Sequence, residues 1–504
     1  MQNLRYVRFA AFVMVILAYV AVRFCGLTDS CLWFDEIFSV HAAEHSWNSL
    51  LSFVASDLIH PPLFYVLLKL WITVGRESLL WLRLFPVIFA GISLAPFALL
   101  CRELKLGIWT QILALLFLAT NGSLIKYSQE VRMYSVLLCF SLFSMWLFAR
   151  YFVKGKSFVP LVLVNLLLIY THYFGWFVVT SEVLAILAFQ RIKWRSIVGM
   201  FVICFLCFLP WMYAVWTAAQ AGSELAQNIG WTMRPGFTGI FRFTLGLIEP
   251  IYYQSTNIEP ASIYRVSLPI LLIVAIVASL YFANWKQQNG TARQNIKLLA
   301  LFSAVPLLIA FIISWLLPYS IWGTRHLIIV FPPLMILLTI ALSNIHLQWM
   351  KAAAITFIIL FSGYAFILQA SRQALQYSWC AWKPLVTDAT TELQANIYTF
   401  EDLVAYNVWF AGRDRQQKNK VFKVNGIDGL VEDKAYFLPR RFNDIVTTNF
   451  DEIIDTKLWI AYRSKKFDST EPPLRNFIFK GYRVVDQRAV EATHESAFFI
   501  LLEK

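Results

Sequence analysis

Charged residues are scarce in this 504-residue sequence, where Asp, Glu, Lys and Arg make up only 14%. Soluble domains contain about 25% charged residues, so the composition argues against a soluble enzyme and against a disordered chain. The seven cysteines form no metal-ligand pattern, because the pair Cys204 and Cys207 lies within an apolar run. Their small number also argues against a disulfide-rich secreted module.

Hydrophobic residues make up 59% of the sequence and aromatic residues 16%. Residues 9–22 form a first apolar stretch, which we interpret as a spanning helix because no small-residue cleavage pattern of a signal peptide follows it. Further stretches of about 20 residues, long enough to cross a bilayer, recur at 79–101, 107–126, 132–152, 196–217, 264–284, 298–317, 325–342 and 349–370.

Residues 158–190 are also apolar, but a single helix of this length would measure about 50 Å, against a bilayer core of about 30 Å. We therefore expect two short helices with a turn at residues 171–175. With this pair, the sequence predicts about eleven membrane crossings.

The net charge of +13 is concentrated in the hydrophobic part of the chain. Residues 1–370 contain 24 basic and 12 acidic residues, whereas residues 371–504 contain 19 and 18. Basic residues mark cytoplasmic loops of membrane proteins, so a nucleic-acid partner is not needed to explain the charge. Eleven crossings place five basic loops in the cytoplasm, those at Arg5/Arg8, Arg102/Lys105, Lys154/Lys156, Arg191/Lys193/Arg195 and Lys286/Arg293/Lys297.

This arrangement requires that the apolar residues 61–75 do not cross the membrane, and we expect a re-entrant or interfacial segment there. The N-terminus then lies in the cytoplasm and the C-terminal part outside. The alternative is a true span at 61–75, compensated by a different number of spans elsewhere.

Residues 371–504 change in composition and predict a soluble, extracytoplasmic α/β domain. A helix is expected at 401–411, and β-rich runs occur at 396–400, 435–438, 458–462, 477–485 and 497–502. We therefore divide the chain into a membrane domain, 1–370, and this second domain. Cys25, Cys31 and Cys380 could share an oxidising compartment, but the sequence does not show which of them pair.

Asp35 and Glu36 follow an aromatic stretch at the outer end of the first expected span. A carboxylate at such a membrane surface can act as a general base. The alternative is structural, with Asp35 as the N-cap of an interfacial helix that runs to His41, and Glu36 complementing the helix dipole.

His60 precedes Pro61 and Pro62, which fix an extended entry followed by a helix start. A side chain beside a helix N-terminus is well placed to bind an anion such as phosphate. The alternative is a solvated histidine at an ordinary helix start.

Other polar residues gather at further outer turns. Arg325 could bind a lipid phosphate bidentately or extend to the interface, and we interpret the deeper Glu182 as a structural partner. The remaining candidates are Lys126, Gln129, Glu130, Arg132 and Tyr134 in one turn, His172 and Tyr173 in another, and His326 beside Arg325.

The order of these motifs resembles the family 39 type of membrane glycosyltransferases in the GT-C superfamily, which includes the protein O-mannosyltransferases and the lipid A aminoarabinose transferase. The resemblance covers the hydrophobic two thirds of the chain. It rests on Trp33-Phe34-Asp35-Glu36, His60-Pro61-Pro62-Leu63, Arg83-Leu84-Phe85-Pro86, residues 127–134, and Arg325-His326-Leu327 before a proline-bearing span.

The resemblance implies a GT-C fold with interfacial helices in the first outer loop. It also implies an inverting enzyme of the bacterial inner membrane. At the outer face, this enzyme transfers a sugar from a polyprenyl-phosphate carrier, undecaprenyl phosphate or similar, to a hydroxyl of a lipid, glycan or protein. Asp35 is then the base, with Glu36 beside it. His60 stands where relatives have a basic residue facing the carrier phosphate, and the aminoarabinose transferases have lysine there.

The chemistry of the residues agrees with these roles. A phosphate leaving group needs cations and hydrogen-bond donors rather than a general acid, and the candidates are His60, Lys126, Arg132, Arg325 and His326. Candidate sugar or acceptor ligands are Gln129, Glu130, Tyr134, His172 and Tyr173. A divalent metal could be held by His60, Glu130 and His172, if these lie together.

Two other functions stay open at this point. The first is a ligase or oligosaccharyltransferase that uses a diphosphate-linked glycan. The second is a transporter of lipid-linked glycans that has no enzymatic activity. A soluble nucleotide-sugar enzyme is not expected, because the sequence lacks a glycine-rich phosphate-binding loop.

Overall fold

The computed structural model describes residues 2–189, 193–222, 232–249, 264–283, 290–370, 378–392, 395–413, 419–430, 436–440, 442–492 and 495–504. These residues form two compact units. The second unit contains Thr28–His45 and the described residues of Gln373–Lys504, and the first contains the rest. The segment Thr28–His45 therefore belongs with the C-terminal part of the chain, although the sequence places it with the membrane domain.

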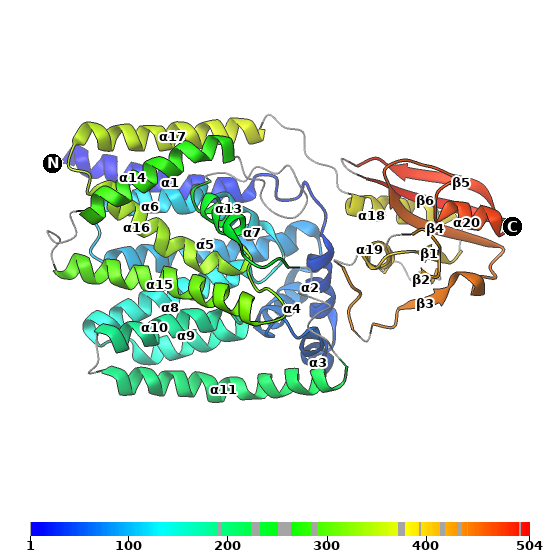
Figure 1. The fold of residues 1–504 in the computed structure, drawn as a ribbon, viewed down its shortest axis with the longest axis horizontal. Coiled ribbons are helices and arrows are strands. Elements are labelled where there is room, and N and C mark those ends of the chain that lie inside the picture. The colour runs from blue at the N-terminus through cyan, green and yellow to red at the C-terminus, as the bar shows by residue number, and fades with distance from the viewer. Residues whose placement is uncertain are drawn as a thin grey trace. The chain divides into compact units, whose positions relative to one another are not determined.

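The first unit is a bundle of helices (Figure 1). They are α1 (Gln2–Phe24), α3 (Trp47–Asp57), α4 (Leu63–Gly75), α5 (Leu79–Glu103), α6 (Ile108–Thr120), α7 (Gly122–Gln129), α8 (Tyr134–Lys154), α9 (Phe158–Thr171), α10 (Gly175–Phe189), α11 (Trp194–Gln220), α13 (Phe237–Ile248), α14 (Tyr264–Ala283), α15 (Gly290–Leu316), η3 (His326–Val330), α16 (Phe331–Ser343) and α17 (Gln348–Ala370). α8 is central and packs on α5 and α9. Its apolar window is 72% buried, against 28% for α11, so α11 presents most of its apolar surface outward, as a lipid-facing helix does.

Six helices of the described residues are long and apolar enough to cross a membrane, namely α1, α5, α8, α11, α15 and η3 with α16. A seventh span results if α6 and α7 count as one, bent by 57°. The eleven expected crossings also include α9, α10, α14 and α17, which are not among these, so that number stays a prediction. α4 measures about 20 Å, which is too short for a direct crossing. Because α9 and α10, which are expected to cross, are hardly longer, length does not decide whether α4 crosses.

The two short helices expected within residues 158–190 are confirmed as α9 and α10, with the turn at His172–Phe174 between them. Gly175 opens α10 in close contact with α9. A Cβ atom at this position would lie 2.8 Å from the carbonyl oxygen of Leu168, so the turn requires glycine.

Several of the basic loops meet at one end of the bundle. Lys154 after α8 forms an ion pair with Glu103 of α5 at 2.5 Å, and Lys193 donates to the carbonyl oxygen of Tyr151 at 2.8 Å. Asn295 near the start of α15 donates to the carbonyl oxygen of Leu104 at 2.8 Å. The positive charges that suggest a cytoplasmic side are thus neighbours in the fold.

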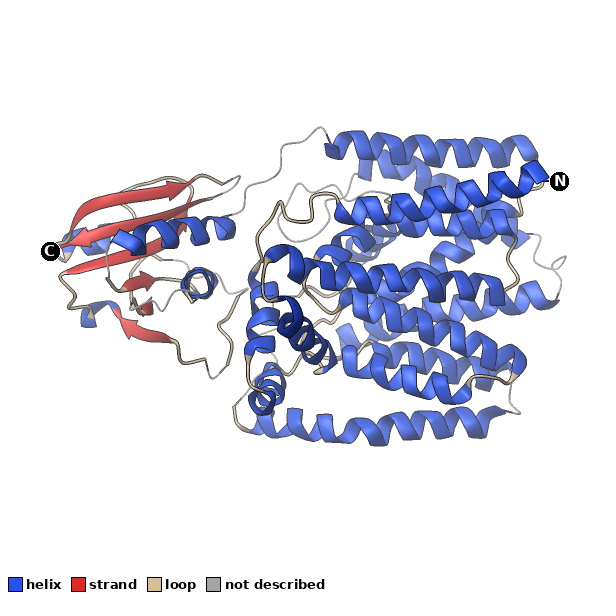
Figure 2. Cartoon of the chain, turned by 180° about the vertical axis from the view of Figure 1, so that it is seen from behind, coloured by secondary structure: helices blue, strands red, loops and turns tan. Residues whose placement is uncertain are grey.

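The second unit is an α/β domain with a six-stranded sheet in its described residues (Figure 2). Its elements are α2 (Phe34–Glu44), η4 (Ser378–Ala381), α18 (Trp382–Glu392), β1 (Ile397–Thr399), α19 (Asp402–Gly412), β2 (Val421–Asn425), β3 (Ile445–Asn449), η5 (Phe450–Glu452), β4 (Lys457–Ser464), α20 (Leu474–Phe479), β5 (Arg483–Val490) and β6 (Ser496–Glu503). The strand order is β3-β2-β1-β4-β6-β5. The first four strands in this order are parallel, and β6 is antiparallel to β4 and β5.

Side chains of the sheet alternate between two apolar layers, as the period of a strand requires. Trp459 and Phe499 stack on the face that α18 and α19 cover. Leu458 and Ile460 point to the opposite face, which Leu474 and Phe477 of α20 cover. Both faces of the sheet are therefore buried, which explains why β4 and β6 are nearly continuous apolar runs.

The sequence locates the central elements of this sheet better than its edges. The expected runs at 396–400, 458–462 and 497–502 correspond to β1, β4 and β6, and the expected helix at 401–411 is α19. The expected β-rich run at 477–485 is wrong at its start, because residues 477–479 form the end of helix α20. The strands β2 and β3 were not expected from the sequence. In the run at 435–438, residue 435 lies outside the described residues and 436–438 form no strand.

Candidate functional site

Three histidines from different connections of the first unit form a cluster. His60 lies between α3 and α4, His172 lies between α9 and α10, and His326 begins η3. The ring centroids of His60 and His172 are 5.6 Å apart, and those of His172 and His326 are 5.3 Å apart. The fold thus brings together three side chains that the sequence shows only as separate candidates.

His60 and His172 are almost fully buried, with 5% and 3% of their surface exposed. His60 Nδ1 donates to Asp57 Oδ2 at 3.2 Å, whereas His172 Nδ1 accepts from the backbone N–H of Phe174 at 3.1 Å. In the neutral rings, Nε2 is therefore an acceptor in His60 and a donor in His172. Neither Nε2 atom has a hydrogen-bond partner among the residues that the structure describes.

Burial and two nearby arginines keep both rings neutral. Burial lowers the pKa of His60 well below its ordinary value, and the charges of Arg132 and Arg325 lower it further. The pKa of His172 is lowered in the same direction, first by burial and then by His60, Arg132 and Arg325. The positive charge of the cluster therefore resides on the two arginines.

The two arginines come from distant parts of the chain. Arg132 is 4% exposed and lies between α7 and α8, and Arg325 is half-buried directly before η3. A guanidinium group can hold two oxygens of one phosphate through parallel hydrogen bonds. This end of the bundle can therefore bind an anion such as a phosphate group.

The remaining candidates of this unit differ in what they contact. Lys126 forms an ion pair with Glu130 at 3.5 Å, and both side chains are buried. Gln129 donates to the carbonyl oxygens of Arg23 and Cys25 at 3.1 and 2.8 Å, which ties α7 to the end of α1.

Two tyrosines lie beside the histidines. The buried ring of Tyr134 lies 6.3 Å from that of His326. The hydroxyl of Tyr173 accepts from Trp211 at 3.2 Å and donates to the carbonyl oxygen of Leu58 at 3.4 Å. Tyr134 is therefore a neighbour of the cluster, while the hydroxyl of Tyr173 links helices.

Asp35 and Glu36 lie on α2 in the second unit. The helix begins at Phe34 and its N-cap is Trp33, so the alternative role of Asp35 as N-cap is wrong. Glu36 is fully buried and accepts from the backbone N–H of Trp33 at 3.1 Å, which closes the helix start. Asp35 occupies the first turn and is half-buried.

The structure assigns the three cysteines whose pairing the sequence leaves open. Cys31 and Cys380 form a disulfide, and Cys25 is free and exposed. Disulfides form and persist mainly in oxidising compartments outside the cytoplasm.

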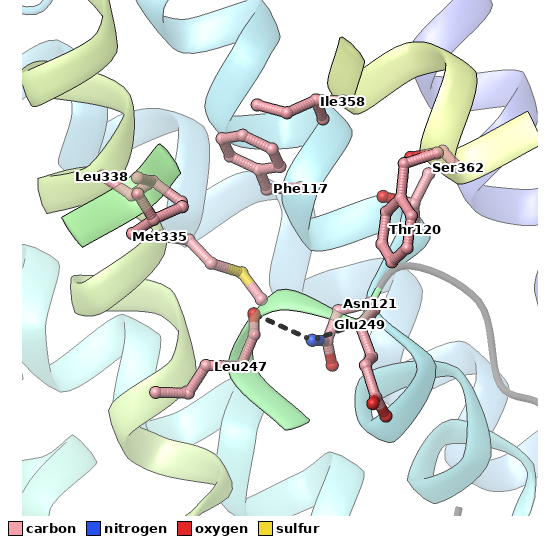
Figure 3. Close-up of a pocket in the computed structure, with 11 residues that line it drawn as sticks. Phe117, Thr120, Asn121, Leu247, Glu249, Met335, Leu338, Ile358 and Ser362 are labelled. Carbon is pink, nitrogen blue, oxygen red and sulfur yellow. Dashed lines mark hydrogen bonds between the residues drawn. The ribbon is translucent and has the colours of Figure 1, made fainter. Parts of the chain in front are cut away.

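An apolar cavity lies in the first unit between α6, α13, α14, α16 and α17 (Figure 3). Its volume is about 30 Å³, which is room for about one or two water molecules. Phe117, Met335 and Ile358 form apolar walls, and Asn121 and Glu249 are polar groups at one side. The cavity is therefore too small for a lipid chain.

Sequence reasoning missed Asn121 and Glu249. Asn121 donates to the carbonyl oxygens of Gly246 and Leu247 at 2.9 and 3.3 Å, and Ser267 donates to Glu249 Oε1 at 3.1 Å. In the sequence, each of these two residues is only a polar residue among apolar neighbours. That pattern does not show that the two side chains line the same cavity.

The residues that the structure describes contain no group of three or more His, Cys, Asp or Glu side chains arranged to hold a metal ion. The set of His60, Glu130 and His172, considered from the sequence, is therefore not formed in these residues. The cluster contains two cations instead, which suit an anion.

Comparison with known proteins identifies the fold. No family model matches the sequence, and no curated protein matches it. The structure is similar to ArnT of Cupriavidus metallidurans bound to undecaprenyl phosphate, with a TM-score of 0.59, 10% identity and 97% of each chain covered. For the apo state of ArnT the TM-score is 0.56, with 11% identity over 99% of this chain and 98% of that chain.

The apo oligosaccharyltransferase of Archaeoglobus fulgidus has a TM-score of 0.49, with 12% identity over 81% of this chain and 64% of that chain. The two ArnT structures show that this chain has the GT-C fold of a membrane protein, with a C-terminal sheet domain. The fold class expected from the sequence is confirmed.

Proposed function

We propose that this protein is a membrane glycosyltransferase that moves a sugar from a polyprenyl-phosphate carrier to a hydroxyl group. The observation that carries the proposal is the cluster of two arginines and three histidines, largely buried at one end of a bundle with the GT-C fold. The similar structure of ArnT is a complex with undecaprenyl phosphate, and a carrier of this class supplies the anion that the cluster suits.

In this proposal Arg132 and Arg325 bind the carrier phosphate. The phosphate leaves with its electrons, and because its last pKa is about 6, it needs charge stabilisation rather than a proton. Arg325 and Arg132 supply that charge, with His326 beside them. Lys126 contributes less, because Glu130 already neutralises it.

His60 has a different role from the one its position in the sequence suggests. Its Nδ1–H donates to Asp57, so a neutral ring offers only an acceptor at Nε2, which does not suit a phosphate oxygen. His172 offers a donor at Nε2. This pair suits a hydroxyl group, which both donates and accepts, so we assign the two histidines to the sugar or the acceptor.

Asp35 is the proposed base that accepts the proton of the attacking hydroxyl. It is half-buried in the first turn of α2, whereas Glu36 is fully buried and engaged with the backbone of Trp33. We therefore assign the chemistry to Asp35 and the support of the helix start to Glu36.

The protein is proposed to lie in a bacterial inner membrane, with the basic loops in the cytoplasm and the disulfide-bonded second unit outside. Acceptors are hydroxyl-bearing lipids, glycans or proteins, and neither a metal ion nor nucleic acid has a role in the proposal.

The test is transfer by the purified protein in proteoliposomes, with a panel of undecaprenyl-phosphate-linked hexoses and pentoses as donors. Release of undecaprenyl phosphate is measured together with the glycosylated product. We expect Asp35→Asn to lower turnover by about 10²- to 10⁴-fold, the usual contribution of a general base. The matched control is Asp29→Asn, an exposed aspartate of the same segment.

Three outcomes would contradict the proposal. Normal turnover of Asp35→Asn would remove Asp35 as the base. Exclusive use of diphosphate-linked donors would favour a glycan ligase or oligosaccharyltransferase. Movement of lipid-linked sugar across the vesicle membrane without any glycosidic product would favour a transporter.

A further inference from the structure

The helix that carries Asp35, α2, is bonded to the C-terminal part of the chain at three points. Cys31, shortly before the helix, is bonded to Cys380. In the last turn of α2, His41 Nδ1 is hydrogen-bonded to the hydroxyl of Tyr406 at 2.9 Å. At the last residue of α2, Glu44 forms an ion pair with Arg413 at 2.7 Å.

Aromatic packing adds to these bonds beside the carboxylate itself. Phe34, the neighbour of Asp35, contacts Tyr406 and Tyr436 edge-on, with ring centroids 5.2 and 5.1 Å apart. Tyr406 also stacks on Trp409, whose ring lies 4.8 Å from that of His41. These rings have few rotamers and are closely packed, so they restrict the rotation and sliding of α2.

The anchoring residues come from the C-terminal part of the sequence. Tyr406 and Trp409 belong to α19, Arg413 follows it, and Cys380 lies in η4. The face of α19 that contacts the sheet packs into the same domain core, through Val404 and Val408. The sheet therefore supports α19, and α19 supports α2.

We propose that the C-terminal domain positions the catalytic base, with Tyr406, Arg413 and Cys380 as positioning residues for Asp35. This inference rests on the proposed function, in which Asp35 takes the proton of the acceptor. Proton transfer requires a base within hydrogen-bond distance, and a displacement of about 1 Å can cost on the order of 10²-fold in rate. The C-terminal domain thus contributes to catalysis by holding Asp35 in position.

The first experiment compares two substitutions that each remove one buried hydroxyl from the same domain. Tyr406→Phe removes the bond to His41 and keeps the ring that packs on Phe34. Tyr398→Phe is the matched control, because the hydroxyl of Tyr398 donates to Asp455 at 2.9 Å on the sheet, away from α2. Hydrogen exchange of the full-length protein and steady-state kinetics with the undecaprenyl-phosphate-linked donor panel are measured for both.

We expect Tyr406→Phe alone to raise the exchange rate of residues 34–44 and to lower kcat by roughly tenfold, with the KM for the donor unchanged. The acid limb of its kcat–pH profile should also move, because the surroundings of the base change. If the substitution merely lowered the fraction of folded protein, kcat would fall by the same factor at every pH, and the acid limb would stay in place.

The second experiment removes the covalent anchor. Cys31→Ser with Cys380→Ser should change the exchange of α2 and the pH profile in the same direction as Tyr406→Phe. Cys207→Ser, which removes an exposed free cysteine of the first unit, is the control and should leave both unchanged.

The outcomes separate this inference from the proposed function. If Asp35→Asn retains transfer, the assignment of the base is wrong and the inference falls with it. If Asp35→Asn abolishes transfer but Tyr406→Phe and the double serine variant leave α2 exchange and the pH profile unchanged, positioning by the C-terminal domain alone is wrong. A uniform rise in exchange across β1–β6 would also overturn it, since the residues would then only stabilise the domain.

Discussion

At the scale of single residues, the charge of the candidate site depends on burial as much as on residue type. Histidine is often a cation near a phosphate, but burial and the arginine charges hold the pKa of His60 below its ordinary value. Arg132 and Arg325 remain charged because guanidinium groups do not lose their proton in proteins. We therefore assign anion binding to the arginines. The neutral histidines are assigned to hydrogen bonds with the sugar or the acceptor.

The first prediction concerns these arginines. Arg132→Gln and Arg325→Gln should each weaken the binding of undecaprenyl phosphate by about 10- to 100-fold, since a hydrogen bond to a charged group contributes about 1.5–3 kcal/mol. Native mass spectrometry of the purified protein with added undecaprenyl phosphate gives the affinities. Arg195→Gln is the control, because this exposed arginine lies at the start of α11, and equal losses in all three variants would show that no specific site exists.

The second prediction follows from His41 in the second unit. Burial lowers the pKa of His41 to about 3, and His45 and Arg413 act in the same direction. The unfolded chain, with a histidine pKa of about 6.5, therefore takes up a proton first as the pH falls. Stability contributed by neutral His41 is complete above pH 6.5 and decreases toward pH 3, by at most about 1.4 kcal/mol per pH unit.

Hydrogen exchange of α2, corrected for the intrinsic effect of pH, measures this loss between pH 7 and pH 5. His41→Gln, which cannot take up a proton, should flatten the dependence. His346→Gln changes an exposed histidine and should preserve the slope of the original protein. An unchanged slope in His41→Gln would show that another group causes the pH dependence.

At the scale of the elements, length and periodicity predicted most helices, and burial explains the failures. Residues 158–190 are too long for one crossing, and this length alone predicts the two helices α9 and α10. The sequence does not predict β3, because most of its side chains are exposed and it contains the polar residues Thr447 and Thr448, so it lacks the apolar pattern of a buried strand. Phe477 belongs to a helix, although its surroundings are rich in aromatic and β-branched residues that favour a strand.

The third prediction tests the turn between α9 and α10, which places His172. Gly175→Ala would bring a Cβ atom to 2.8 Å from the Leu168 carbonyl oxygen, so the turn must shift. Overpacking of this kind costs about 1–3 kcal/mol, and we expect a lower thermal unfolding midpoint in detergent and reduced transfer. Gly199→Ala is the matched control, because nothing lies within 4 Å of a Cβ atom there and alanine favours the helix.

A lower midpoint for Gly199→Ala than for Gly175→Ala would contradict this account. Equal transfer by Gly175→Ala and the original protein would show that the position of His172 is not important for activity.

At the scale of the whole molecule, the sequence named the candidate residues but not their partners. Local motifs suggested His60, His172 and His326 one at a time, and their meeting depends on contacts between helices far apart in the chain. The attachment of α2 to α19 depends on contacts such as Phe34 with Tyr406, which no local pattern reveals. The division into 1–370 and 371–504 therefore left Asp35 with the membrane helices, whereas the contacts group it with the C-terminal part.

The fourth prediction concerns the sides of the membrane. Lys154 and Lys193 lie at the end of the bundle where the basic loops meet, and the disulfide of Cys31 and Cys380 belongs to the second unit. Basic loops face the cytoplasm and disulfides persist outside it, so two independent principles assign opposite sides to these features. A cysteine in place of the exposed Lys466 of the second unit should then react in intact cells with a membrane-impermeant maleimide.

The background for this labelling is Cys25→Ser with Cys207→Ser, which removes the exposed free thiols of the described residues. Arg102→Cys, at an exposed position beside the ion pair of Lys154 and Glu103, is the matched probe for the other side. It should react only after the cells are permeabilised. Labelling of both probes in intact cells would overturn the topology, because the basic loops and the second unit would then lie on the same side. Labelling of Arg102→Cys alone would reverse it, because the basic loops would then lie outside. It would also remove the reason for placing transfer at the outer face, since Asp35 belongs to the same unit as Lys466.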